Sequence, residues 1–288
     1  MFYTLTLKLK CYIMKKIIVL LLVITCSLGF SREITPNSSD LSVSYTMFYK
    51  NHLTSKSTQT ANTTLIVKNQ ESLFTFEGMM NFNQIQKERA LTMADLLTNK
   101  VPVHFLIKSK GDQVEHFETI GSDSYSFKEK VNHSWKLIDR DTLIHGFVCK
   151  NATLNYGGRE WNAWYAPEIP ISVGPYKFHG LPGLIMAIND REHVFSFIAN
   201  EIKKGHFVFD SKIEDYFIKD GGKPFESINK DEFYKIRKKF SEMTINEKIK
   251  YSNRDEAAIP ELMIQGQQQN SPGLSTIANK KNYIEYIE

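Results

Sequence analysis

The feature that most constrains the fold of this chain is a run between Trp161 and Asp190 that is dense in glycine, proline and aromatic residues. Four prolines lie between positions 167 and 182, and each of them fixes φ and removes a backbone donor. Glycines at positions 174, 180 and 183 permit positive φ or a close approach of two backbones. The run predicts a strand, a tightly specified turn and then a buried strand.

The segment Leu181-Pro182-Gly183 suits a type II turn, with Gly183 at the position that needs positive φ. The run is either a rigid corner of the sheet or a loop that contacts a ligand, and the corner is preferred because no cluster of catalytic residue types lies in it. The candidate ligand-binding or structural residues are Trp164, Tyr165, Pro167, Glu168, Pro170, Gly174, Pro175, Tyr176, Phe178, Gly180, Leu181, Pro182, Gly183, Leu184 and Ile185.

Short alternating runs separated by turn signals make up most of the remaining chain. Such runs at near-regular spacing predict a mainly β (α+β) fold, a curved antiparallel sheet or half-barrel with one or two covering helices. The expected strands are 41–49, 63–67, 72–76, 105–109, 114–120, 125–131, 135–138, 147–156, 159–165, 184–189 and 194–202. The charged triplets 139–141 and 190–192 are interpreted as solvated loops.

Two stretches have helical periodicity. The first is 83–98, which would form a lid or cover one face of the sheet. The second is 230–243, where Asn229 is a good N-cap and Glu232 follows three residues later, as in a capping box. Apolar residues of this second helix fall on one face. Its basic residues, Lys235 and 237–239, are expected to form a solvated face.

The first 31 residues have the pattern of a secretory signal, with a start at Met14 also possible. Lys15 and Lys16 precede an apolar run that is too short to span a bilayer, and small residues follow it. We therefore expect an exported protein, periplasmic, associated with the outer membrane or extracellular, with no transmembrane segment after cleavage. Cys26 lies in a weak lipoprotein-like box, and its lipidation would tether the protein to a membrane.

The charge of the chain changes when this signal is removed. The net charge of +4 comes from 36 basic and 32 acidic residues, and residues 1–31 hold four lysines and no acids. The mature chain is therefore neutral, which removes the main electrostatic reason for nucleic-acid binding. We expect a single β-rich domain over 32–255, followed by a polar tail over 256–288 whose last residues alternate as in an edge strand.

No familiar catalytic or metal-binding pattern is present in the sequence. Cys149 is the one cysteine of the mature chain and lies in an alternating run, so a buried strand position is preferred to a reactive thiol paired with His145. The eight histidines are scattered, and His104 with His116 across a hairpin would not complete a metal site. No nucleophile elbow, P-loop or dinucleotide fingerprint occurs. We expect no catalytic residue, no metal and no cofactor, although an enzyme with an unfamiliar site, such as a peptidase, stays open.

The run 180–185 reads Gly-Leu-Pro-Gly-Leu-Ile, and the sequence resembles the GLPGLI family of Bacteroidetes secreted proteins, which is named for it. The segments 149–153, 164–170 and 174–178 also resemble that family, and the likeness covers roughly residues 40–250. Members often end in an N-P-[IL]-E-like tail, whereas Asn282-Tyr283-Ile284-Glu285 lacks the proline.

The resemblance implies an exported location and a β architecture, since the family has no established activity. A more distant similarity to LolA-like half-barrels, which cradle lipid in the periplasm, rests on strand count and secretion. The preferred hypothesis is a non-catalytic binding module for a hydrophobic ligand, such as a lipid, or for a peptide. The alternative is a structural or accessory envelope protein that works with an outer-membrane transporter.

Overall fold

The computed structural model describes residues 40–50, 55–90, 92–99, 101, 105–205, 207, 225–252 and 284–285. All of them belong to one compact unit, Ser39–Glu288. The predicted signal segment, Cys26, His104 and most of the predicted tail lie outside the described residues. None of the described helices is long and apolar enough to cross a membrane.

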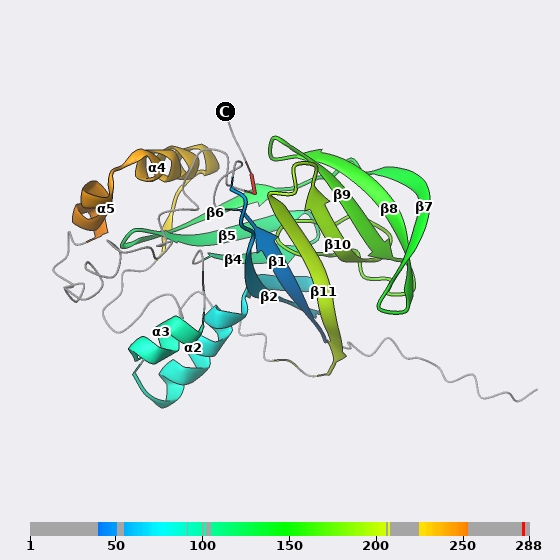
Figure 1. Ribbon diagram of the computed structural model, residues 1–288, viewed down its shortest axis with the longest axis horizontal. Helices are drawn as coiled ribbons and strands as arrows, with labels where there is room; N and C mark the ends of the chain where they lie inside the picture. The colour runs from blue at the N-terminus through cyan, green and yellow to red at the C-terminus, as the bar shows by residue number, and fades with distance from the viewer. Residues whose placement is uncertain are drawn as a thin grey trace, which may run out of the picture. The chain divides into compact units, whose positions relative to one another are not determined.

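The described chain is mainly β, as the alternating runs predict (Figure 1). Its strands are β1 (Leu41–Tyr49), β2 (Gln59–Lys68), β3 (Glu71–Phe76), β4 (Phe105–Lys110), β5 (Gln113–Ile120), β6 (Asp123–Lys130), β7 (Lys136–Ile144), β8 (Phe147–Tyr156), β9 (Arg159–Ala166), β10 (Leu184–Asp190), β11 (Phe195–Lys204) and β12 (Glu226–Ser227). Its helices are α2 (Glu77–Glu88), α3 (Met93–Thr98), α4 (Lys230–Glu242) and α5 (Ile245–Ser252).

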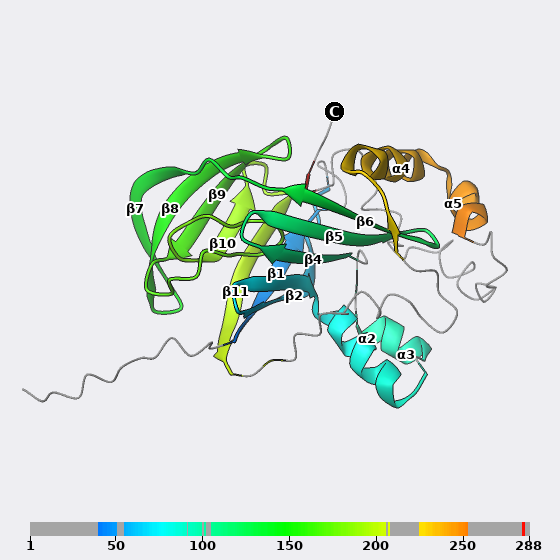
Figure 2. The same cartoon turned by 180° about the vertical axis from the view of Figure 1, so that it is seen from behind.

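All twelve strands join one open sheet in the order β12-β6-β5-β4-β3-β2-β1-β11-β10-β9-β8-β7. Neighbouring strands are antiparallel, apart from the parallel pair of β12 and β6. In Figures 1 and 2 the ribbons of β4–β6 run across those of β1 and β11, so the sheet bends over its own inner face. Contacts across this face include Phe74 of β3 with Phe197 of β11, whose ring centroids are 6.0 Å apart.

The segment 167–183, which joins β9 to β10, fills the inner face of the bent sheet. Tyr176 and Phe178 are 5% and 1% exposed and belong to the main apolar core. The ring of Phe178 lies 4.7 Å from that of Trp161 on β9, and the ring of Tyr176 lies 5.7 Å from that of Phe105 on β4. This connection therefore links both arms of the sheet.

The helical prediction for 83–98 is wrong in its bounds, because two helices replace one. The first, α2, begins at Glu77 and ends at Glu88, and α3 begins after Thr92. Thr92 and Asp95 form a capping box, in which the Thr92 side chain accepts from the Asp95 backbone and the Asp95 carboxylate accepts from Thr92. A capping box satisfies the free donors of a new helix start, so the chain restarts here instead of continuing.

The second helical prediction is confirmed to within one residue, since α4 spans Lys230–Glu242. The Asn229 side chain accepts a hydrogen bond from the Glu232 backbone at 2.8 Å, as an N-cap does. The expected solvated basic face is wrong for Arg237, which is 8% exposed and 3.4 Å from Glu118 of β5. A carboxylate on the covered strand draws this guanidinium inward.

Both charged triplets predicted to be loops carry strand residues. Residues 139–141 lie within β7, whose register with β8 shifts between Ile138 and Asp141. Asp190 ends β10 and is fully buried, and it accepts hydrogen bonds from Arg159 at 2.7 Å and from the Phe195 backbone at 2.7 Å. A buried partner, which local sequence does not reveal, converts an apparent surface charge into a structural one.

Candidate functional site

Close packing requires glycine at positions 174 and 183, whereas Gly180 has a left-handed φ of +94° and only ordinary contacts, and the run does not form a hydrogen-bonded type II turn. The Gly183 backbone donates to Leu181 at 2.8 Å, and Leu184 donates to Ile169 at 3.0 Å, so the hydrogen bond that closes a type II turn is absent here. A Cβ at Gly183 would lie 2.3 Å from the carbonyl oxygen of Ala166. A Cβ at Gly174 would lie 2.7 Å from Ile185. The run is a tightly packed corner.

The candidate residues named from the sequence fall into two groups at this corner. The buried ones are Tyr165, Gly174, Pro175, Tyr176, Phe178, Leu181, Gly183, Leu184 and Ile185, and the exposed ones are Pro167, Glu168, Pro170, Gly180 and Pro182, with Trp164 half-buried. Most of the buried residues pack in the apolar core. Tyr176 alone among them carries a polar atom to the charged cluster described next.

A tight turn places Tyr176 and Lys177 in the interior. The Phe178 backbone donates to Pro175 at 3.1 Å, and Tyr176 adopts a left-handed φ of 56°. A non-glycine residue rarely adopts such a φ without support from its surroundings. The turn drives the Lys177 ammonium into the core, where its side chain is 0% exposed.

Two buried carboxylates hold this ammonium. Lys177 Nζ lies 2.5 Å from Glu129 Oε1 on β6 and 2.6 Å from Glu285 Oε1. The side chains of Glu129 and Glu285 are 8% and 2% exposed. Lys230, at the start of α4, forms a second ion pair with Glu129 and lies 3.9 Å from Glu285 Oε2. The two ammonium groups and two carboxylates balance in charge.

Glu285 reaches this cluster from the far end of the chain. The Tyr176 hydroxyl donates to its Oε1 at 2.7 Å, and the Tyr234 hydroxyl of α4 donates to its Oε2 at 2.7 Å. We call the four groups that surround this carboxylate, from Tyr176, Lys177, Lys230 and Tyr234, the carboxylate socket. A carboxylate with charged and neutral donors on both oxygens is a strongly held one.

Glu285, Tyr176 and Tyr234 keep fixed protonation states near neutral pH. Burial alone would raise the pKa of Glu285, but the Lys177 ammonium, its hydrogen bond, Lys230 and Tyr176 outweigh burial and lower that pKa. Burial and then the Glu285 charge raise the pKa of both Tyr176 and Tyr234. The carboxylate therefore stays ionised and the tyrosines stay protonated donors.

A second buried ion pair adjoins the socket. His116 Nε2 lies 2.8 Å from Glu118 Oε2 on β5, and Arg237 approaches the other Glu118 oxygen. Burial and then the nearby Lys177 charge lower the pKa of His116. Burial would raise the pKa of Glu118, but Arg237 and His116 together lower it. His116 and Glu118 both lie on β5, so it is the ion pair of Arg237 with Glu118 that fastens α4, which carries Tyr234 and Lys230, onto the sheet.

Histidines also support the turn from its other side. His133 Nε2 lies 3.1 Å from the Lys177 carbonyl oxygen, and the rings of His133 and His179 are 4.9 Å apart. Burial lowers the pKa of His133 from 6.5 to about 4, so the ring is neutral at neutral pH and donates to that carbonyl. The indole of Trp135 donates to the His179 carbonyl at 2.8 Å.

Cys149 occupies the buried strand position predicted for it. Its side chain is 0% exposed on β8, and burial raises the pKa of its thiol to about 11. His145 lies in the β7–β8 turn and contacts the Ala199 carbonyl at 2.7 Å. A thiol with so high a pKa is a poor nucleophile. Within the described ranges, no three His, Cys, Asp or Glu residues are grouped to hold a metal ion.

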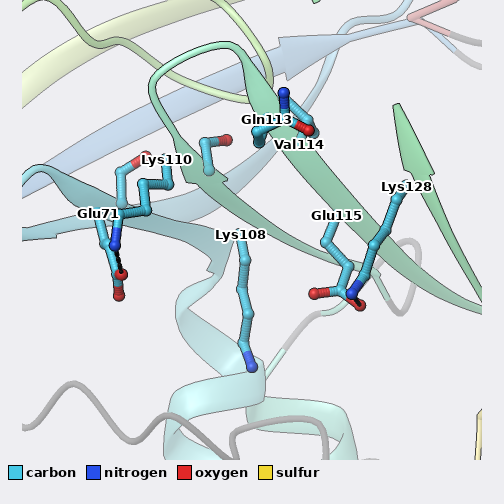
Figure 3. Close-up of a pocket in the computed structure, with 9 residues that line it drawn as sticks. Glu71, Lys108, Lys110, Gln113, Val114, Glu115 and Lys128 are labelled. Carbon is cyan, nitrogen blue, oxygen red and sulfur yellow. Dashed lines mark hydrogen bonds and ion pairs between the residues drawn. The ribbon is translucent and has the colours of Figure 1, made fainter. Parts of the chain in front are cut away.

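A surface pocket of about 370 Å³ lies on the outer face of β3–β6 (Figure 3). It is lined by Glu71, Ser72, Lys108, Ser109, Lys110, Gln113, Val114, Glu115 and Lys128. Ion pairs join Lys110 to Glu71 and Lys128 to Glu115. Because successive strand residues point to opposite faces, Lys128 lines this pocket while Glu129 enters the socket. The pocket and the socket are therefore separate.

Most of the socket does not stand out in the sequence. Lys177 is absent from the candidate residues named from the sequence although its two neighbours are among them. Glu129, Lys230, Tyr234 and Glu285 are absent as well. One signal was available for Lys177. It lies between Tyr176 and Phe178 in a segment rich in apolar residues, where a charge implies a buried partner.

Comparisons with known proteins find one short family match and several similar solved structures. A family model described as "Protein of unknown function (Porph_ging)" matches residues 150–187, which include β9 and Lys177. The structure of PNGF-II in space group P21 is similar with a TM-score of 0.48 and 11% identity over 69% of this chain and 33% of that one. The structure of PNGF-II in space group C2 is similar with a TM-score of 0.49 and 12% identity over 69% of this chain and 32% of that one. No curated protein matches.

The chain therefore spans about a third of the length of the PNGF-II chains to which it is similar. The family match agrees with the expectation of a family of unknown function. Because the match covers a short part of the chain, the resemblance to the GLPGLI family stays a prediction.

Proposed function

We propose that this protein is a non-catalytic binding module whose ligand is a polypeptide segment, and that the carboxylate socket is its recognition site. The observation that supports the proposal is the seating of Ile284 and Glu285, which are 6% and 2% exposed. A glutamate from the end of the chain meets two ammonium groups and two phenol hydroxyls supplied by the turn 175–178 and α4.

The filled inner face of the sheet favours a peptide over a lipid as the ligand. A lipid carrier needs an apolar cavity of several hundred cubic ångströms, on the order of 300–1,000 Å³. In the described residues, side chains of the segment 167–183 occupy this face, with Phe178 and Leu181 both 1% exposed. A short extended segment needs far less space, because a few buried side chains anchor it.

The protonation states of the socket favour binding over catalysis. A general acid or base works best when its pKa lies near the operating pH. Here the pKa of Glu285 is lowered, and those of Tyr176 and Tyr234 are raised away from neutrality. The groups are arranged to hold a charge and not to transfer a proton.

We also propose that the module acts outside the cytoplasm, in the periplasm, at the outer membrane or extracellularly. The support is the signal-like pattern of residues 14–31. An exported chain with a single buried cysteine cannot rely on an internal disulfide, so the buried charges and apolar core of the sheet must hold it together.

The socket is tested with the variant Glu285→Ala in the full chain, which removes the carboxylate but keeps Cβ. Acetate has the size of the deleted group, so it should raise the melting temperature of this variant, whereas neutral acetamide should not. A synthetic peptide of residues 280–288 should raise it further at much lower concentration. Glu160→Ala, which removes an exposed partner of Arg191, is the matched control. Equal effects of acetate on both variants, with no effect of the peptide, would contradict the proposal.

A further inference from the structure

We propose that Ile284–Glu285 is a resident competitor for the socket, which an external polypeptide displaces by presenting an apolar residue directly before a glutamate. Gly157 is the residue that selects such a segment. The proposal rests on the proposed function and adds to it the class of partner and the way in which access is controlled.

The site reads two successive residues. Ile284 packs into the main apolar core and is 6% exposed, while the next side chain enters the socket. In a regular strand, successive side chains point to opposite faces, and one of them faces solvent on an exposed surface. Burial of both side chains defines a two-residue motif, an apolar residue followed by a carboxylate.

The charge of the socket requires that a carboxylate replace the one that leaves. When Glu285 withdraws, Lys177 and Lys230 share Glu129 alone, and the buried site holds an excess positive charge. An uncompensated buried charge is strongly destabilising. A neutral segment therefore cannot displace the resident one, whereas a second glutamate restores the balance. Aspartate is about 1.5 Å shorter and does not reach the donors from the same backbone position.

Gly157 sets how closely the segment passes over the sheet. This residue lies in the β8–β9 turn at φ +59°, and a Cβ on it would lie 2.8 Å from Glu285 Cα and 3.0 Å from Glu285 Cγ. Real Cβ atoms do not approach backbone so closely, so any larger side chain at 157 pushes out the segment that carries the glutamate. Gly111, also at φ +59°, has no atom within 4 Å of such a Cβ. Alanine substitutions at the two glycines therefore separate the effect of steric exclusion from the effect of backbone strain.

The resident segment has the advantage of belonging to the same chain. Covalent linkage gives an intramolecular ligand an effective concentration on the order of millimolar. An external segment therefore displaces the resident one only if the ratio of its concentration to its dissociation constant exceeds the same ratio for the resident segment. Wild-type protein is expected to respond to a strong partner and to ignore weak ones.

The test uses fluorescence anisotropy with a labelled peptide of residues 280–288 and the full chain throughout. Compared with wild type, the variant Ile284→Asn/Glu285→Ala, which lacks both resident anchors, should bind the peptide at least about tenfold more tightly. Adding Gly157→Ala to this variant should abolish binding, whereas adding Gly111→Ala should not. Peptides carrying Glu285→Gln or Ile284→Asn should bind at least about tenfold more weakly.

The outcomes distinguish the two proposals. If the anchorless variant is folded by circular dichroism and does not bind the peptide, the proposed function fails. If it binds the peptide no better than wild type does, the socket binds segments but the resident pair is no competitor. If Gly157→Ala and Gly111→Ala behave alike, Gly157 does not select the segment.

A second measurement keeps the proposal testable if the anchorless variant does not fold. In wild-type protein, excess unlabelled peptide should speed hydrogen exchange at residues 284 and 285 in proportion to its concentration, and the Glu285→Gln peptide should not. Unchanged hydrogen exchange at saturating peptide would overturn the proposal that Ile284–Glu285 competes for the socket.

Discussion

At the residue scale, the protein depends on a lysine that it buries completely. Burying an ammonium group costs several kcal/mol unless partners repay the lost hydration. Lys177 has such partners in Glu129 and Glu285, and its Nζ lies 5.0 Å and 5.2 Å from the ring centroids of Phe127 and Tyr176. Ion pairs and ring faces together explain why a charge occupies the centre of the core.

Because His133, which contacts the Lys177 carbonyl, is neutral in the folded protein, we expect a loss of stability in mild acid. Burial, the largest influence, lowers the pKa of His133 from 6.5 to about 4. The hydrogen bond to the Lys177 carbonyl acts to raise this pKa, the neighbouring His179 lowers it, and the charges of Glu285 and Glu129 act to raise it. Between those pH values the unfolded histidine binds a proton that the folded one does not. Stability is therefore full above about pH 6.5 and falls as the pH drops towards 4.

The measurement is the free energy of unfolding in urea between pH 7 and 4. Glutamine does not titrate, so between pH 7 and 4 the free energy of unfolding of His133→Gln should fall by about 2–3 kcal/mol less than that of wild type. His193→Gln, at an exposed turn position, should leave the slope as it is in wild type. Identical slopes for His133→Gln and wild type would show that His133 titrates normally in the folded protein.

At the element scale, local patterns predicted the strands well and the charged residues poorly. The run 147–156 coincides with β8 because alternation and the flanking turns specify a strand without outside help. Arg237 and Asp190 were predicted to be solvated, yet each is buried against a partner on another element. A sequence pattern records which residues have charge but not which strand brings the opposite charge.

The corner 167–183 was predicted as a rigid feature, and its mechanism differs from the one expected. Gly174 and Gly183 are required where a side chain or a second backbone comes close, as at Gly183 beside Ala166, whereas Gly180 is required by its φ of +94°. Turn propensity is a local property, whereas this contact depends on how β9 and β10 pair. The sequence could therefore indicate that glycine was required, but not which atoms required it.

Gly183→Ala should destabilise the protein severely, because its Cβ would lie 2.3 Å from the Ala166 carbonyl oxygen. We expect a loss of about 3 kcal/mol or more in the free energy of unfolding by urea. Gly146→Ala is the matched control, since Gly146 has a φ of +83° but no atom within 4 Å of the added Cβ. That change should cost only about 1–2 kcal/mol of left-handed strain. Equal losses at both positions would refute the close-packing explanation.

At the scale of the whole molecule, an open sheet bends around one connecting segment and receives a residue from the far end of the chain. The fold class could be predicted because it depends on the sum of many local alternations. The socket could not, since Tyr176 and Glu285 are 109 positions apart and no local pattern links them. The polar tail with a possible edge strand stays a prediction, and the part of it that the structure describes is a buried pair, Ile284 and Glu285.

The most direct test of the central claim, that Glu285 sits in the carboxylate socket, is a double-mutant cycle on unfolding free energy. Tyr234→Phe removes one donor, whose hydroxyl lies 2.7 Å from Glu285 Oε2, and Glu285→Ala removes the acceptor. We expect a coupling of about 1 kcal/mol or more between the two changes, and none between Tyr234→Phe and Glu160→Ala. A Tyr234–Glu285 coupling within about 0.3 kcal/mol of zero would contradict it.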